Sequence, residues 1–79
     1  MIKLKVKILG RWYERGGKTI KEALMKIKVP VVKGGSTVVI DNGEKVKEYV
    51  FNSFITRNFF GTANSNNKEI AVKLLESRL

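Results

Sequence analysis

The stretch that decides the fold is Ile2–Ile8, IKLKVKI, near the start of the chain. Apolar residues occupy every even position, and Lys3, Lys5 and Lys7 occupy the odd positions between them. Strict alternation of this kind is typical of a β-strand with one buried face and one exposed face. We therefore expect a strand whose exposed face is made of lysines. Lysines on a strand also block edge-to-edge pairing with other chains, so the array has a purely protective interpretation as well.

The residues that follow this strand allow two interpretations. RWYER, residues 11–15, leads into Gly16 and Gly17, a pair typical of a turn. For residues 20–26 we favour a helix, because apolar residues recur at helical spacing and Thr19 with Glu22 forms a capping-box pattern. The alternative is a strand that returns from a hairpin closed at Gly16 and Gly17.

The middle of the chain predicts a β-hairpin. Residues 29–33 and 37–40 are rich in β-branched residues and are separated by Gly34, Gly35 and Ser36. From Asp41 onward we favour a helix, since Asp41 and Glu44 fit a capping box and the apolar positions to Phe54 suit a helical period. The alternative is a turn at residues 42–43 followed by a strand over residues 44–51 that returns on residues 37–40.

The C-terminal part predicts a loop over residues 61–67 and then an amphipathic helix to Leu79, with Asn66 and Glu69 as its capping pair. Together these segments predict one α+β domain over residues 1–79. The expected fold is a small sheet, formed by the N-terminal strand and a β-hairpin, packed against one to three helices that include a C-terminal helix.

Length and composition restrict the chemistry. A chain of 79 residues has a small core, so a homodimer is a secondary expectation. The absence of Cys and His excludes disulfides and Cys/His zinc sites, and we expect no metal and no cofactor. The apolar runs are too short to span a membrane, and the N-terminus does not resemble a signal peptide, so we expect a cytoplasmic, intracellular protein.

An enzyme is not expected. Without His or Cys, a general base would have to be a carboxylate, a lysine or a tyrosine, and the seven acidic residues are scattered along the chain. Gly34, Gly35 and Ser36 lack the surrounding residues of a phosphate-binding loop.

Positive charge is the most informative feature of the sequence. The net charge is +9, and residues 1–33 hold ten basic and two acidic residues, against six and five in residues 34–79. Such asymmetry is typical of proteins that bind polyanions. We therefore expect non-enzymatic binding of DNA or RNA. The candidate binding residues are Lys3, Lys5, Lys7, Arg11, Trp12, Tyr13, Arg15, Lys18 and Lys33.

Aromatic residues refine this expectation in two places. Trp12 either offers a stacking platform for an unpaired base or belongs to the core, and Tyr13 would point to the other side of an extended segment. The alternative function is a protein-protein interaction module or homodimeric adaptor that uses the Phe-rich residues 51–60. In that case Phe59 or Phe60 would protrude and form the interface, because adjacent rings do not share one helix face.

Two short stretches resemble known families. GKTIKEAL at residues 17–24 and TVVIDNGEKV at residues 37–46 resemble the helix and strand of ubiquitin-like β-grasp sulfur carriers. The chain ends in Glu-Ser-Arg-Leu and not in the Gly-Gly that carrier chemistry needs, so the resemblance implies a fold only. Residues 29–50 are similar to the wing and following helix of winged-helix excisionase-type DNA binders, which implies DNA binding.

Overall fold

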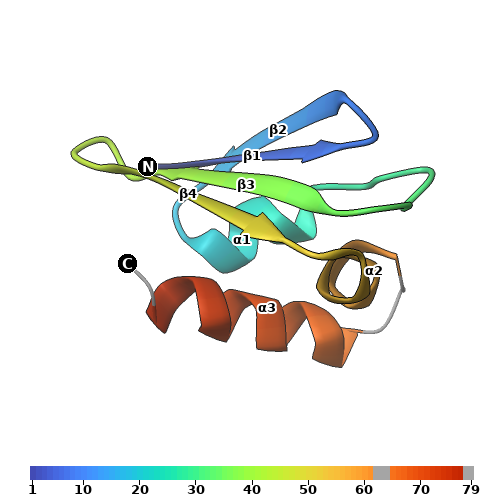
Figure 1. Ribbon diagram of the computed structural model, residues 1–79. Coiled ribbons are helices and arrows are strands. Elements are labelled where there is room, and N and C mark those ends of the chain that lie inside the picture. Colours follow the sequence, from blue (N-terminus) through green and yellow to red (C-terminus); the bar gives the residue numbers. More distant parts are fainter. Residues whose placement is uncertain (62–64, 78–79) are drawn as a thin grey trace.

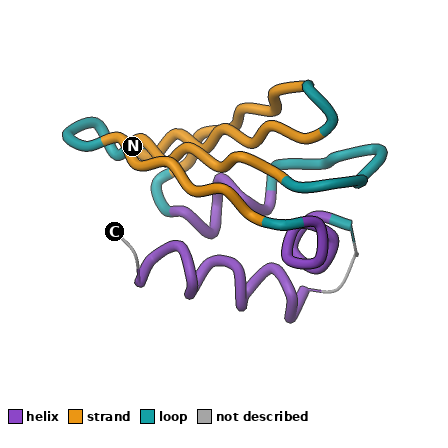
Figure 2. Tube along the Cα trace, in the orientation of Figure 1, coloured by secondary structure: helices purple, strands orange, loops and turns teal. Residues whose placement is uncertain are grey.

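The computed structural model describes residues 1–61 and 65–77, with the side chains of residues 65–68 left aside. The elements follow in the order β1 (Ile2–Ile8), β2 (Arg11–Gly17), α1 (Ile20–Met25), β3 (Ser36–Asp41), β4 (Val46–Phe51), α2 (Ser53–Phe60) and α3 (Ser65–Ser77). The fold is thus α+β, with a four-stranded sheet and a C-terminal helix, as the sequence predicts. All three helices lie on one side of the sheet (Figures 1 and 2).

The predicted N-terminal strand is confirmed, and it lies in the interior of the sheet. The strand order is β2-β1-β3-β4 and every neighbouring pair is antiparallel. Leu4, Val6 and Ile8 are buried against the helices, so the three lysines of β1 project from the opposite face. Because β1 is paired on both sides, its lysines do not protect an edge, and that interpretation of the array is wrong.

The turn between β1 and β2 replaces the turn expected at Gly16 and Gly17. Leu9 and Gly10 both have positive φ angles, 54° and 73°, and they join paired residues Ile8 and Arg11 as a two-residue turn. The predicted Gly-Gly turn is wrong, because both glycines belong to β2. Gly17 instead makes room for α1, since a Cβ there would lie 2.9 Å from the backbone nitrogen of Ala23.

The helix favoured after this strand is confirmed and covers Ile20–Met25. Thr19 is its N-cap, and the Thr19 hydroxyl accepts a hydrogen bond of 3.1 Å from the Glu22 backbone N–H. Ile20, Ala23 and Leu24 are buried beneath the sheet, as their helical spacing predicts.

The predicted hairpin between residues 29–33 and 37–40 is wrong, because residues 29–33 form no strand. β3 pairs with β4 instead, so the helix favoured from Asp41 is also wrong and the alternative strand is correct. The connection over residues 42–45 is held by Asn42, whose side-chain oxygen accepts hydrogen bonds from the backbone N–H groups of Glu44 and Lys45. This local bonding, together with pairing along β3, outweighs the helical spacing of the apolar residues.

The last two helices close the core from below the sheet. α2 begins after the N-cap Asn52 and ends at Gly61, and its Thr56, Phe59 and Phe60 are buried. The expectation that Phe59 or Phe60 protrudes is therefore wrong, because both rings are buried, and Phe59 packs in T-shaped contacts with Phe51 of β4 and with Phe60. The ring that does protrude is Phe54, which is 71% exposed.

The C-terminal helix begins earlier than the sequence predicts. It starts at Ser65, so Asn66 lies inside the helix and is not its N-cap. Ala71, Val72 and Leu75 are its buried residues. Residues 62–64 of the predicted loop lie outside the described residues. The predicted end of the helix, at Leu79, also lies outside them. None of the helices described is long and apolar enough to cross a membrane.

Candidate nucleic-acid interface

The face of the sheet that the helices leave uncovered, here the open face, consists of three rows that cross the strands. The register places Trp12, Lys7, Thr37 and Val50 side by side in the first row. Glu14, Lys5, Val39 and Glu48 form the second row. The third row consists of Gly16 on β2, Lys3 on β1, Asp41 on β3 and Val46 on β4, and Gly16 contributes no side chain to it.

The lysines of β1 share this face with an equal number of carboxylates. Lys3 forms an ion pair of 3.3 Å with Glu14, and Asp41 stands opposite Lys3 on β3. Lys5 is half-buried, and its direct neighbour on β2 is Glu14. The open face therefore has no net charge as a whole, and an array of lysines along β1 is not by itself an attractive track for a polyanion.

Positive charge is instead unbalanced at one end of the sheet. Residues 5–13, 23–40 and 49–61 contain no acidic residue, and these segments meet where β1 turns into β2, where β3 begins and where β4 ends (Figure 1). We call this the basic end and define it by four of its exposed cations, Lys7, Arg11, Lys28 and Lys33. Arg57 of α2 is a further exposed cation in the same segments. The acidic residues Glu14, Asp41 and Glu48 occupy the rows further from it.

Trp12 lies at this end and its ring is accessible. The residue is 51% exposed, so the interpretation of Trp12 as a core residue is wrong. The Lys7 ammonium lies 5.8 Å from the centroid of the indole ring, within the range of a cation-π interaction. An exposed indole beside a cation can stack on a base while the cation contacts the adjoining phosphate.

The other aromatic and basic residues of β2 point to the opposite side. Tyr13 pairs with the buried Val6 and packs half-buried against the core, as expected for the neighbour of an outward Trp12. Arg11 and Arg15 share this side of β2, and the Arg15 guanidinium donates a hydrogen bond to the Glu14 carbonyl oxygen. Because β2 is an edge strand, both arginines nevertheless stay exposed.

The predicted binding residues are thus not all brought together. Lys7, Arg11, Trp12 and Lys33 lie at the basic end. Lys18 lies in the connection from β2 to α1 and Lys3 near the start of β1, both at the other end of the sheet. Tyr13 contributes to the core and not to an exposed surface. The single set predicted from the sequence divides into a group at the basic end and a group away from it.

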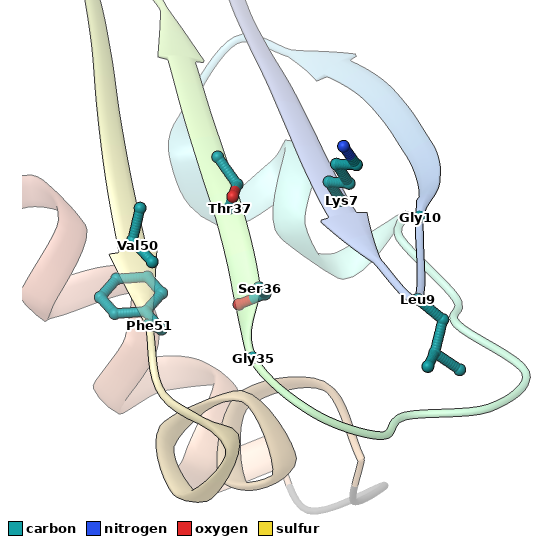
Figure 3. Close-up of a pocket in the computed structure, with 8 residues that line it drawn as sticks. All are labelled: Lys7, Leu9, Gly10, Gly35, Ser36, Thr37, Val50 and Phe51. Atoms are coloured by element: carbon teal, nitrogen blue, oxygen red, sulfur yellow. The ribbon is translucent and has the colours of Figure 1, made fainter.

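A shallow cavity of about 260 Å³ opens at the basic end. Of the residues that line it, only Lys7 is a candidate binding residue from the sequence. Figure 3 shows the cavity between the turn after β1, the first residues of β3 and the last residues of β4. Thr37 and Val50 line it from the first row of the open face. The residues of its wall include no acid. Only the strand register brings these residues together, which explains why no local sequence pattern indicates them.

The described residues do not include a group of three or more His, Cys, Asp or Glu side chains that could hold a metal ion. No family model, curated protein or solved structure matched the chain in comparison. The two family resemblances of short segments therefore receive no support from whole-chain similarity.

Proposed function

We propose that this protein binds single-stranded nucleic acid, without catalysing a reaction on it, at Trp12 and the basic end. The observation that supports this most strongly is the half-exposed Trp12 ring with the Lys7 ammonium 5.8 Å from its centroid, on the open face of a chain with net charge +9. An aromatic ring next to a cation can bind both parts of a nucleotide, because the ring stacks on the base and the cation neutralises the phosphate.

A single strand fits this surface better than a duplex. Bases in a duplex are already stacked on both faces, so they gain little from Trp12. A duplex laid along the sheet would also bring its phosphates over Glu14, Asp41 and Glu48 of the second and third rows. A single strand confined to the basic end contacts Lys7 on the open face and avoids these carboxylates. The exposed Arg11, at the edge strand β2, and the exposed Lys33, shortly before β3, add positive charge at the same end.

The decisive experiment uses the fluorescence of Trp12, the only tryptophan in the chain. Single-stranded DNA and RNA of the same sequence, the matching duplex and poly-glutamate are titrated separately. We expect quenching by one or both single strands and little quenching by the duplex, because stacking changes the environment of the indole. If the single strands neither quench nor bind, or if poly-glutamate displaces them with comparable affinity, the proposal is wrong.

A matched pair of variants tests whether binding occurs at the basic end. Lys7→Gln and Lys3→Gln each remove one positive charge from the same face of β1, four residues apart. We expect Lys7→Gln to weaken binding of a single strand by about tenfold, in line with the loss of one charge-assisted contact. Lys3→Gln should have little effect, because Lys3 is already paired with Glu14. Equal losses in both variants would indicate general attraction and no defined site.

A further inference from the structure

We propose that the cavity at the basic end is the subsite for the nucleotide next to the one stacked on Trp12, so that the bound strand runs across the β-strands along the first row. This inference rests on the proposed function and extends it by giving the direction of the bound strand. The alternative direction follows the lysines of β1, from Lys7 to Lys5 and Lys3.

The order of side chains in the first row supports the crossing direction. The first row crosses β2, β1, β3 and β4, and its side chains are in that order Trp12, Lys7, Thr37 and Val50. Neighbouring strands lie about 4.8 Å apart, so Trp12 and Val50 are separated by about 14 Å. At the 3.4 Å rise of stacked bases this distance spans about four nucleotide steps, and fewer in an extended strand. The cavity is lined from Lys7, the direct neighbour of Trp12, onward, so the nucleotide that follows the stacked one reaches it. Lys7 lies between Trp12 and the cavity, where it can contact the phosphate that joins two nucleotides.

The walls of the cavity offer both apolar and polar groups to a base. Its volume of about 260 Å³ is just below the roughly 300 Å³ at which pockets for drug-sized ligands begin, so it suits a group no larger than a single base. Val50 and Leu9 offer exposed apolar surface, and Thr37 can offer its hydroxyl group. Gly35 leaves the wall next to Phe51 without a side chain, and a Cβ at that position would come within 2.6 Å of the Phe51 carbonyl oxygen.

Leu9 supplies a second and independent observation. Its backbone has a positive φ of 54°, which residues other than Gly, Asn and Asp rarely adopt. The residue is 59% exposed. Neither core packing nor turn geometry favours leucine there, since two-residue turns of this kind prefer Asn-Gly. Its side chain extends from the turn at the rim of the cavity (Figure 3). A strained residue at the rim of a cavity is typical of binding sites.

Two valines of β4 provide a matched test of the subsite. Val50 and Val46 are 78% and 65% exposed on the open face, but only Val50 lines the cavity. Val50→Glu and Val46→Glu change the net charge equally and should both fold. With a single-stranded tetranucleotide as the probe and Trp12 quenching as the readout, we expect Val50→Glu to bind about tenfold more weakly than Val46→Glu, because its carboxylate faces the bound strand.

An uncharged variant keeps the test independent of long-range electrostatics. Leu9→Asn suits the turn and removes the apolar rim, so we expect weaker binding of the tetranucleotide by several-fold in a protein that is no less stable. The inference is overturned if Val50→Glu and Val46→Glu bind equally well, or if Leu9→Asn binds like the unchanged protein. Failure of the unchanged protein to bind any single strand would instead overturn the proposed function, and this inference with it.

Discussion

The hydroxyl groups of Ser36 and Thr56 lie 2.8 Å apart in the core, where they join the first residue of β3 to the middle of α2. Both side chains are buried, and one hydroxyl donates a hydrogen bond to the other. Ser36 also lines the cavity at the basic end, so this hydrogen bond holds one of its walls against the helix layer.

This pair predicts a non-additive effect on stability. Thr56→Val leaves the buried Ser36 hydroxyl without its partner, and we expect the free energy of unfolding to fall by about 1–3 kcal/mol. The double variant Ser36→Ala with Thr56→Val should be less destabilised than the sum of the two single variants, because no polar group is then left without a partner. Urea unfolding of the four proteins measures this coupling. Additive effects would contradict a direct interaction between the two hydroxyls.

Leu9 predicts that a substitution at an exposed turn stabilises the protein. Leu9→Asn removes the cost of holding leucine at positive φ, so the free energy of unfolding should rise by about 1 kcal/mol. Thermal unfolding monitored by circular dichroism measures the change as a higher Tm. A suitable control is Val46→Asn, an exposed position within β4, where asparagine should be neutral or destabilising. An unchanged or lower Tm for Leu9→Asn would contradict the strained turn.

The adjacent Gly16 and Gly17 of β2 should respond differently to substitution by alanine. A Cβ on Gly17 would lie 2.9 Å from the Ala23 backbone nitrogen and from the Glu22 Cβ, so Gly17→Ala forces α1 away from the sheet. We expect a loss of about 1–3 kcal/mol in stability. Gly16→Ala meets the Ile2 carbonyl oxygen at an ordinary 3.5 Å and should be nearly neutral. Chemical denaturation of both variants checks the difference, and equal losses would contradict the close approach of α1 to β2.

Elements specified by neighbouring residues can be predicted from this sequence, and elements specified by long-range pairing cannot. β1 and α1 could be predicted because alternation in residues 2–8 and the Thr19 cap are determined by neighbouring residues. The helix that the sequence favours over β4 is wrong, since its apolar spacing suits a helix and only pairing with β3 makes it a strand. The turn at Leu9 could not be predicted, because leucine is not a residue that such a turn selects.

The candidate site shows the same dependence on long-range pairing. Trp12 and Lys7 are both candidates from the sequence, but the exposure of the indole depends on the register in which β2 pairs with β1. The lysines of β1 were correctly assigned to an exposed face, whereas the carboxylates that balance them come from β2, β3 and β4. The sequence therefore indicated the charge of the molecule but not the end of the sheet at which it is unbalanced.

Substitution of Trp12 should weaken binding without a comparable loss of stability. Trp12→Ala removes the stacking platform, so binding of a labelled single strand, measured by fluorescence anisotropy, should weaken by about 1–3 kcal/mol. The protein should keep its fold, because the ring is half-exposed and contributes little to the core. Tyr13→Phe on the other side of β2 is the control and should bind normally. Equal binding by Trp12→Ala and the unchanged protein would contradict stacking.

Substitution of two loop lysines, Lys33 and Lys18, should change the salt dependence of binding differently. Each phosphate contact of a single strand adds about −0.7 to the slope of log K against log salt concentration, so the four cations of the basic end give a slope of about −3. Lys33→Gln removes one of these contacts and should make the slope less steep by about 0.7. Lys18→Gln removes an equal charge from a loop at the other end of the sheet and should leave the slope unchanged. If both variants reduce the slope alike, the contacts are spread over the whole surface, and the basic end is not the site.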